Sequence, residues 1–320
     1  MRAAIVENYG APERVRIAEL PVPVPGAGEL LVRVHAAAVT SADARIRAAR
    51  FPRGFAPMAR LMFGVRRPRR QVLGSAFSGV VEAVGPAARG SDAGGFAPGD
   101  EVSGMTGSPM GAHAEYLCIA ASRAVPKPAA VSHEDAAGVL FGGSTALYFL
   151  RKKADVAPGT SVLVIGASGA IGTNAVQLAA RAGARVTGVC SAGNRALVAG
   201  LGAERTIDRA GTEWAEHDGR YDVVLDTVGV LSPASGRRLL TERGVLLLAV
   251  ADLWQILGAH GNVKSGTAPE RPEDVALLLQ MLAAGELVSV TDLVAPLEDI
   301  AAAHARVDTG RKVGNVIVRP

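Results

Sequence analysis

Several residue types that define special classes of protein are scarce in this chain of 320 residues. Two cysteines, Cys118 and Cys190, build neither a disulfide framework nor a four-cysteine zinc site. Apolar residues make up 49%, yet no uninterrupted run reaches the ~20 residues that cross a membrane. The N-terminal sequence MRAAIVENYG lacks the apolar core of a secretory signal. We therefore expect a reduced, cytoplasmic protein with no membrane partner.

The charge balance argues against a nucleic-acid-binding protein, and the glycine content indicates special backbone geometry. Lys and Arg total 34 against 30 Asp and Glu, and a net charge of +4 is too dilute for a nucleic-acid footprint, so no nucleic-acid partner is expected. Glycine is abundant, at 38 residues, which indicates tight turns or close approaches of backbone to a ligand. The length suffices for two globular domains of about 150 residues each.

The rhythm of apolar segments changes twice along the chain. From residue 1 to about 123 the segments are short and broken by Pro and Gly, which is typical of a closed or bent β domain. Residues 124–287 alternate strands with helices, as parallel βαβ units do, and residues 236–244 (GRRLLTERG) are expected to form one of these helices. From residue 288 to 320 short β segments return, and we expect them to rejoin the first domain. The predicted fold class is α/β with a second, β-rich domain.

A glycine-rich turn at residues 166–172 (GASGAIG) is the strongest local feature. Strand-like residues precede it, a helical pattern follows, and a second strand arrives about 20 residues later. Glycines at 166, 169 and 172 allow backbone amides at a helix N-terminus to approach a pyrophosphate. The spacing GxxGxxG departs from the strict GxGxxG, but its context favours dinucleotide binding over a structural turn. The predicted contact residues are Gly166, Ala167, Ser168, Gly169, Ala170, Ile171 and Gly172.

The end of the second strand selects between NADH and NADPH. An acidic residue there binds the ribose 2′-hydroxyl and repels a 2′-phosphate, and residues 189–195 (VCSAGNR) contain none. Ser191, Asn194, and Arg195 or Arg209 are candidates to hold a phosphate by hydrogen bonds and charge. NADPH is therefore the predicted cofactor.

Nine motifs in register make the chain similar to the medium-chain dehydrogenase/reductase superfamily, in its zinc-independent quinone oxidoreductase-like branch. They run from MRAAIVENYGAPE through VHAAAVTSAD, LGSAFSGVVEAVG, PGDEV, GAHAEY, GGSTAL, GASGAIG and YDVVLDTVG to PLEDIAAAHARVDTGRKVGNVIV. The resemblance covers nearly the whole chain. It implies a GroES-like β-barrel catalytic domain (1–123 and 288–320), a Rossmann cofactor domain (124–287) and a cleft between them. It also implies a homodimer, and the apolar segment 245–258 with Trp254 either forms its edge or lines the cleft.

The zinc ligands of related alcohol dehydrogenases are replaced in this sequence. The family's ligand Cys corresponds to Thr40, three residues before Asp43, and its His-Glu pair corresponds to Ser75 and Ala76. Neutral hydroxyls and a methyl group do not substitute for thiolate and imidazole. We expect no catalytic zinc, and therefore reduction by hydride transfer rather than metal-assisted alcohol oxidation.

The proton donor is the weakest part of the resemblance. Tyrosines that follow the Asp43 position in many relatives are absent, because this chain reads Arg45-Ile46-Arg47. Thr40, Ser41 and Arg45 are the candidates for oxyanion contact, although a hydroxyl after a strand is more often a cap. His113 in GAHAEY is either a proton donor or, more commonly, a packing histidine.

The remaining candidates are expected near the cofactor. Ser144 and Thr145 follow Gly142-Gly143 at an expected helix start, where they would cap the helix, and the resemblance places them near the nicotinamide. Two strand ends lie where the ligand crevice of a parallel sheet is expected. Lys312 either corresponds to a cofactor-adjacent position of related reductases or is an exposed, solvated lysine. The residues at those two strand ends are Val228, Gly229, Ala249 and Val250.

Residues 51–71 (FPRGFAPMARLMFGVRRPRRQ) mix Phe, Met and Leu with arginines. They are predicted to form either a helical flap over the substrate entrance or a solvated rim. The alternative is a basic patch for nucleic acid or an acidic carrier. The solvated rim is the interpretation we favour.

Three functions fit the sequence. The first is an NADPH-dependent oxidoreductase that reduces quinones or α,β-unsaturated carbonyls, small electrophilic substrates, without zinc. The second is an enoyl reductase, or a related redox enzyme of a biosynthetic pathway, that acts on a specialised or carrier-bound substrate. The third is a nucleotide-sensing or RNA-binding protein that retains the fold without catalysis.

Overall fold

The computed structural model describes residues 1–86, 95–215 and 217–320, which form two compact units. Unit 1 comprises Met1–Phe51, Ala56–Phe141 and Glu270–Pro320, and unit 2 comprises Pro52–Phe55 and Gly142–Pro269. The chain passes from one unit to the other inside helix α3 (His133–Leu147). The domain limits near residues 124 and 288 stay a prediction.

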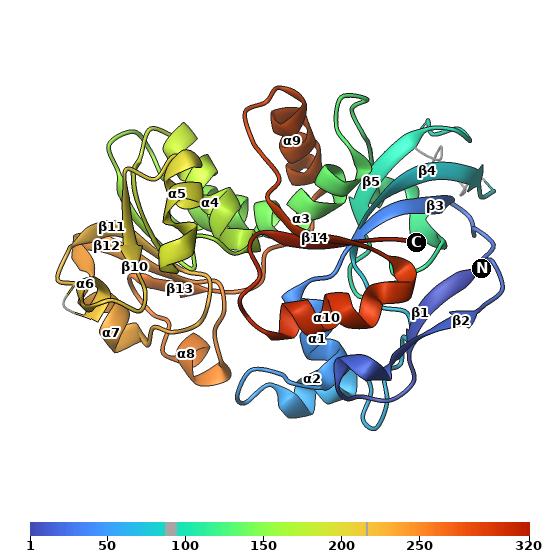
Figure 1. The fold of residues 1–320 in the computed structure, drawn as a ribbon, viewed down its shortest axis with the longest axis horizontal. Helices are drawn as coiled ribbons and strands as arrows, with labels where there is room; N and C mark the ends of the chain where they lie inside the picture. Colours follow the sequence, from blue (N-terminus) through green and yellow to red (C-terminus); the bar gives the residue numbers. More distant parts are fainter. Residues whose placement is uncertain (87–94, 216) are drawn as a thin grey trace. The chain divides into compact units, whose positions relative to one another are not determined.

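Unit 2 is built on a six-stranded parallel sheet with helices on both faces (Figure 1). The strand order is β10-β9-β8-β11-β12-β13, so the chain starts in the middle and winds outward in both directions. This topology brings the carboxyl ends of β8, β9, β11 and β12 to one edge, where parallel sheets bind ligands. The strands are β8 (Ser161–Ile165), β9 (Arg185–Cys190), β10 (Arg205–Asp208), β11 (Tyr221–Asp226), β12 (Leu240–Leu248) and β13 (Val263–Ser265). The helices are α4 (Ala170–Arg181), α5 (Arg195–Gly200), α6 (Thr212–Ala215), α7 (Pro233–Arg237) and α8 (Leu253–Leu257).

Strand β8 shows why this sheet is buried on both faces. Val162 and Val164 pack into a cluster with α4 and α5, whereas Leu163 and Ile165 pack into a second cluster on the opposite face. Because side chains alternate along a strand, a run of apolar residues supplies both cores at once. The predicted parallel βαβ organisation is confirmed.

The helix expected over residues 236–244 is wrong. Helix α7 ends at Arg237, and β12 begins at Leu240. A Cβ on Gly244 would lie 2.6 Å from the carbonyl oxygen of Tyr221 in β11, so this glycine lies against the backbone of the neighbouring strand. Leu240 already pairs with Tyr221 in the sheet, so this part of the segment is strand, and the short α7 lies in the connection before it.

Unit 1 contains a seven-stranded sheet and a separate two-stranded sheet. The larger one runs β14-β15-β3-β4-β5-β7, with β6 also pairing with β3, so the C-terminal segment rejoins the first part of the chain as predicted. Its strands are β3 (Glu29–Ala38), β4 (Ala76–Val84), β5 (Glu101–Met105), β6 (Tyr116–Ala120), β7 (Ala124–Pro126), β14 (Thr291–Pro296) and β15 (Asn315–Arg319). The smaller sheet pairs β1 (Arg2–Val6) with β2 (Val15–Glu19).

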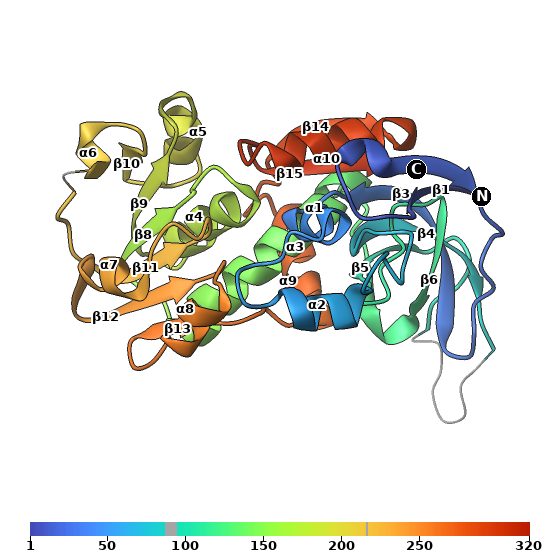
Figure 2. The same cartoon turned by 90° about the horizontal axis from the view of Figure 1, so that it is seen from below.

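In the described residues of unit 1, four α-helices accompany the first part of α3. They are α1 (Ser41–Ala48), α2 (Ala56–Phe63), α9 (Pro272–Ala283) and α10 (Ile300–Asp308). The sequence analysis overlooked α10, which lies alongside β14 and β15 (Figure 2). Its buried residues Ile300, Ala303 and Val307 follow helical spacing, so the periodicity was present but the segment is short. In the described residues, no helix combines the length and apolarity that a bilayer crossing requires.

Candidate functional site

The turn after β8 has a conformation that only glycine fits at its first position. Gly166 has φ +78°, and a Cβ there would lie 2.4 Å from Cγ2 of Val228 and 2.6 Å from Oγ1 of Thr227. The amides of Gly166 and Ala167 both donate to the carbonyl of Val189, at 3.0 Å each, which ties the turn to β9. Gly166 therefore packs against Thr227 and Val228 at a position where no side chain is tolerated.

The other two glycines differ from each other. A Cβ on Gly172 would lie 2.1 Å from the carbonyl oxygen of Gly166, so α4 packs directly on the turn. Gly169 is the N-cap of α4, and a Cβ there would make only a 3.4 Å contact. Ala170 and Ile171 follow in the first turn of α4, where helical amides lack intrahelical partners and the helix dipole favours an anion. Close packing thus requires Gly166 and Gly172 more strongly than Gly169.

Polar side chains gather at the end of β9. Nε of Arg209 donates to Oγ of Ser191 at 3.0 Å, and Nδ2 of Asn194 donates to Oγ of Ser168 at 3.0 Å. Arg195 has a different role, since its guanidinium donates to the hydroxyl and carbonyl of Thr206 at 3.0 and 2.8 Å. Of the two candidate arginines, the structure brings Arg209 to Ser191 and holds Arg195 on β10.

Asp226, which was not among the residues expected at this site, connects the ends of β11 and β12. Asp226 is fully buried, and its carboxylate accepts from the amides of Val228, Gly229 and Leu231 at 2.8–2.9 Å. A Cβ on Gly229 would lie 3.1 Å from Cγ1 of Val250. The amide of Ala249, for its part, donates to the Asp226 carbonyl at 3.0 Å. In the sequence, the indication of this buried carboxylate is an Asp at the end of an apolar strand.

The capping role expected for Ser144 and Thr145 is wrong. Helix α3 begins at His133, after Ser132, whose Oγ accepts from the amide of Asp135 at 3.1 Å. Gly142 lies inside the helix, and it is a glycine because a Cβ there would lie 2.2 Å from the carbonyl oxygen of Ala170 in α4. Ser144 is buried, and no described residue makes a hydrogen bond to its Oγ. Thr145 follows it in the last turns of α3.

Thr40 and Asp43 cap helix α1 in unit 1. The amide and Oγ1 of Thr40 both donate to Oδ2 of Asp43, at 2.8 and 2.6 Å, and Oγ1 accepts from the Asp43 amide at 3.2 Å. Oδ1 of Asp43 accepts from the amide of Gly74 at 3.1 Å, which anchors the segment that leads to Ser75 and Ala76. Both capping side chains are buried. The hydroxyl proton of Thr40 is thus already donated within the protein.

Ser41 and Arg45 occupy the same helix and are more accessible. Both are half-buried, and burial lowers the pKa of Arg45 from its ordinary value. Among the described residues no carboxylate forms an ion pair with Arg45. A partly desolvated cation with no counter-ion is suited to stabilise developing negative charge.

His113 lies in the core instead of at an open surface. Its exposure is 1%, and Nε2 lies 3.1 Å from the carbonyl oxygen of Ala38. Its ring meets that of His304 edge-on, with ring centroids 5.8 Å apart. This placement favours the packing interpretation.

Beneath α1 lies a buried polar group that we call the α1 layer: Thr40, Asp43, Arg47, His304 and Asp308. Arg47 is fully buried; Nη2 pairs with Asp308 at 2.5 Å and Nη1 donates to the carbonyl of Gly10. His304 is fully buried, and neither ring nitrogen has a partner in the described part of the chain. Burial first, and then the neighbouring His113 and Arg47, hold the pKa of His304 well below its ordinary value. Its ring is therefore neutral near pH 7.

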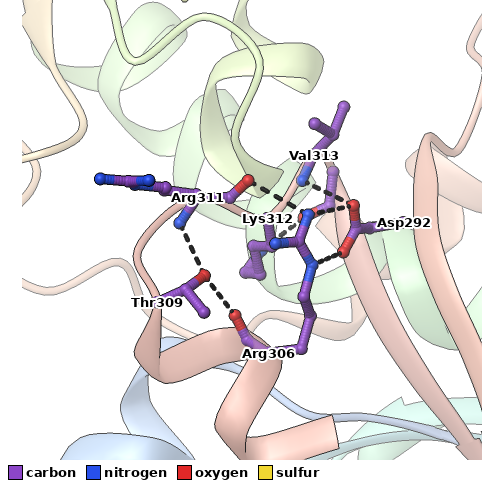
Figure 3. A network of polar contacts seen from close by, with 7 residues as sticks. Asp292, Arg306, Thr309, Arg311, Lys312 and Val313 are labelled. Atoms are coloured by element: carbon purple, nitrogen blue, oxygen red, sulfur yellow. Dashed lines mark hydrogen bonds and ion pairs between the residues drawn. The ribbon is translucent and has the colours of Figure 1, made fainter.

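Lys312 lies in a loop that a network of hydrogen bonds holds in place (Figure 3). Arg306 binds the Asp292 carboxylate through Nε and Nη2, at 2.5 and 2.8 Å, and that carboxylate also accepts from the amide of Val313. The Lys312 ammonium donates to the carbonyl of Gly314. Burial lowers the pKa of Lys312 to about 8, because Asp292 is occupied by Arg306 and offsets only part of the effect.

Two known families match this chain. Residues 26–129 match the alcohol dehydrogenase GroES-like domain, and residues 201–318 match a family described as zinc-binding dehydrogenase. The matched segments fall on the strands of unit 1 and on the second half of unit 2 followed by the C-terminal segment.

Whole-chain similarities agree with these matches. The chloroplastic quinone-oxidoreductase QR1 of Triphysaria versicolor is 26% identical, over 100% of this chain and 98% of its own. A mycocerosic acid synthase-like polyketide synthase of Mycobacterium tuberculosis is 32% identical over 69% of this chain, which spans only 10% of that synthase. The solved quinone oxidoreductase of Coxiella burnetii has a TM-score of 0.87 at 24% identity, covering 100% of this chain and 99% of its own. The predicted fold, a GroES-like domain with a Rossmann-type parallel sheet, is confirmed.

Proposed function

Because the chain is a quinone-oxidoreductase-like member of the medium-chain dehydrogenase/reductase superfamily, we propose that it uses NADPH to reduce quinones or α,β-unsaturated carbonyls without zinc. Members of this superfamily bind a nicotinamide cofactor. The choice of NADPH, the absence of a catalytic metal and the substrate class are the substance of the proposal.

The hydrogen bond between Arg209 and Ser191 is the observation that carries the choice of NADPH. It places a guanidinium and a hydroxyl together at the end of β9, where a ribose 2′-phosphate is expected in this fold. The other arms of the Arg209 guanidinium remain able to bind a phosphate. The nearby acidic residue, Asp208, lies on the neighbouring strand β10 opposite Cys190 and not at the end of β9 itself. Its Oδ1 accepts a hydrogen bond from the amide of Ala210 at 3.2 Å.

The glycine turn fits the pyrophosphate of such a cofactor. Side chains are excluded at Gly166 and Gly172, and the N-terminus of α4 directs amides outward. We propose that residues 166–172 and Asn194 bind the phosphates, and that Val228, Gly229, Ala249 and Val250 line the nicotinamide end together with Ser144 and Thr145. We also propose Lys312 as a cofactor contact, on the family resemblance alone. When bound, NADPH supplies a hydride from the nicotinamide ring.

The donor set around Thr40 supports chemistry without zinc. Thr40 is engaged with Asp43, and Ser75 and Ala76 offer a hydroxyl and a methyl group. Across the described residues, no three His, Cys, Asp or Glu side chains come together in an arrangement that would hold a metal. We propose that Ser41 and Arg45 stabilise the negative charge on the substrate oxygen. Thr40 contributes less to this contact, because its proton is already donated to Asp43.

The test is to titrate purified protein with NADPH and NADH and to follow oxidation of the nicotinamide with menadione and a panel of enones. We expect tighter binding of NADPH, turnover, and no loss of activity after treatment with a chelator. Arg209→Gln should weaken NADPH binding about tenfold, as loss of a charge-assisted hydrogen bond does, and leave NADH binding unchanged. Arg195→Gln is the matched control. Equal affinity for both nucleotides, or no turnover with any acceptor, would contradict the proposal.

A second candidate function is reduction of an enoyl thioester. The 32% identity to a mycocerosic acid synthase-like polyketide synthase, over 69% of this chain, favours it. Turnover of crotonyl-N-acetylcysteamine, with none of menadione, would select this function over the first.

A homodimer is proposed as the working form. Strand β13 is an edge of the unit 2 sheet, and the nearby α8 exposes Trp254 and Leu257 at 66% and 67%. Light scattering of wild type and Trp254→Ser tests the assembly: we expect a dimer that the substitution weakens.

A further inference from the structure

Helix α2 exposes its apolar side chains to solvent instead of burying them. Met58, Leu61 and Met62, at helical spacing i, i+3 and i+4, are 55–66% exposed, and Val65 just beyond the helix is 59% exposed. The inward face is formed by Ala59 and Phe63, which pack against unit 1. A helix that displays its larger apolar stripe has an unpartnered face.

The loop that follows α2 is fixed rather than loose. The hydroxyl of Tyr9 donates to the carbonyl of Gly64 at 2.7 Å, and the amide of Arg69 donates to the carbonyl of Phe63 at 2.7 Å. Gly64 has φ +124°, and a Cβ there would lie 1.9 Å from the carbonyl of Arg67. The ring of Phe63 stacks on Phe51 with centroids 5.9 Å apart. The surface is therefore preorganised, which lowers the entropy cost of binding a partner.

This loop carries an unbalanced positive charge. From residue 44 to residue 81 the sequence contains nine arginines and no Asp or Glu. Arg60 is used within the fold, since it donates to the carbonyl of Val65 at 2.9 Å. Four exposed arginines form no ion pair or hydrogen bond through their side chains with any described residue. We call them, together with the apolar face, the α2 patch: Met58, Leu61, Met62, Val65, Arg66, Arg67, Arg69 and Arg70.

The composition of the α2 patch favours a protein partner over other polyanions. Met and Arg are enriched at protein interfaces, and Met adapts to different apolar surfaces. Nucleic acid would leave the four apolar side chains unmatched. A membrane-binding amphipathic helix carries its Lys and Arg along its own polar face, whereas the four exposed arginines here lie in the loop after α2. The complement is a helix with an apolar stripe surrounded by carboxylates.

We propose that the α2 patch docks an acidic helix of a carrier protein that presents the substrate as an enoyl thioester. This rests on the proposed function in its thioester form, and it names the partner that delivers the substrate. In the reaction, a hydride from NADPH goes to Cβ of the enoyl group and a proton from solvent goes to Cα. The carbon–carbon double bond becomes single, NADPH becomes NADP⁺, and the thioester bond stays intact.

The first test measures binding without turnover. Fluorescently labelled bacterial acyl carrier protein, which is acidic and helical, is titrated with the full chain by anisotropy at two salt concentrations. We expect saturable binding that weakens with salt. Arg66→Gln/Arg67→Gln and Leu61→Ser/Met62→Ser should each weaken it about tenfold. The control Arg151→Gln/Lys152→Gln removes the same charge from exposed positions outside the patch and should change nothing.

The second test compares the same acyl group on two supports. With crotonyl carrier protein, the patch variants should lose kcat/KM in proportion to their loss of affinity, whereas with crotonyl-N-acetylcysteamine they should match wild type. If neither thioester is reduced but the carrier protein still binds at the patch, the function fails and the docking surface stands. No binding, equal loss in the control variant, or binding only to vesicles of anionic phospholipid or to RNA would overturn the proposal.

Discussion

The glycine turn of unit 2 and the α1 layer of unit 1 are constructed in different ways. In the turn, backbone atoms define the geometry: a Cβ on Gly172 would lie 2.1 Å from a carbonyl oxygen. In the α1 layer, charged side chains define it: a fully buried guanidinium meets the carboxylate of Asp308, beside a histidine that has no partner in the described residues. Substitution disrupts the turn by steric overlap, whereas it disrupts the α1 layer by leaving a charge without its partner.

That difference determines how substitutions propagate. Steric overlap at the turn acts on the ligand site directly, because the turn backbone is the site. Loss of charge in the α1 layer acts on the stability of unit 1, because Arg47 and Asp308 pair with each other inside the fold. A stability measurement paired with a binding or kinetic measurement therefore distinguishes the two regions.

The largest stability effect is expected at Arg47. Arg47→Met removes the guanidinium and leaves Asp308, among the described residues, with the ion pair to the exposed Arg50 at 2.7 Å. Breaking a buried ion pair from one side typically costs 3–5 kcal/mol, and the residual partner reduces the expected loss to about 3 kcal/mol. Urea unfolding measures it. NADPH affinity of the folded protein should not change, and a loss of affinity at full stability would contradict the separation of the two regions. Arg50→Met is the control, with an effect under about 1 kcal/mol.

At the turn, Gly172→Ala should act chiefly on NADPH binding and less on stability. Its Cβ would overlap three backbone atoms of Gly166 and Ala167, none of which is a flexible side-chain end. Overpacking of this kind costs about 2 kcal/mol, and the shifted backbone should abolish measurable NADPH binding. Gly200→Ala is the matched control: a Cβ there meets no atom within 4 Å, and alanine should stabilise helix α5 by about 0.5–1 kcal/mol. Fluorescence titration and thermal unfolding distinguish the two variants.

The turn could be predicted from the sequence and the α1 layer could not. Residues 166–172 are contiguous, so strand, turn and helix are visible together, and so is the lack of an acid after β9. Arg47 and Asp308 are 261 positions apart, and the pairing of β15 with β3 and the packing of α10 on α1 bring them together. The sequence alone also did not separate Arg209 from Arg195, because the choice depends on which one bonds to Thr206.

Thr40 lies where capping and chemistry overlap, and its expected effect is smaller. Thr40→Ala removes the cap of α1 and should cost about 1 kcal/mol in unfolding free energy, while Thr40→Ser should retain most of it. If the hydroxyl serves only Asp43, both variants keep the wild-type kcat with menadione. A kcat that falls in the alanine variant and is restored in the serine variant would return Thr40 to the oxyanion contact.

The smallest effect concerns Lys312 and its pH dependence. The pKa of this lysine is lowered to about 8 by burial, so its positive charge is present below pH 8 and is lost above it. If the ammonium contacts the cofactor, which is an anion, NADPH affinity falls as the pH rises from 7 to 9, by about threefold.

Three variants isolate this contribution. Lys312→Met should abolish the pH dependence, and Lys312→Arg should keep the high affinity to the alkaline end of the range. Lys152→Met, at an exposed position, is the control and should behave as wild type. The folded protein holds the Lys312 proton less tightly than the unfolded chain does, so the charge lowers stability at pH 7 and Lys312→Met should be neutral or stabilising. A destabilised Lys312→Met with an unchanged pH profile would show that Lys312 serves the loop held by Asp292 and Arg306 and not the cofactor.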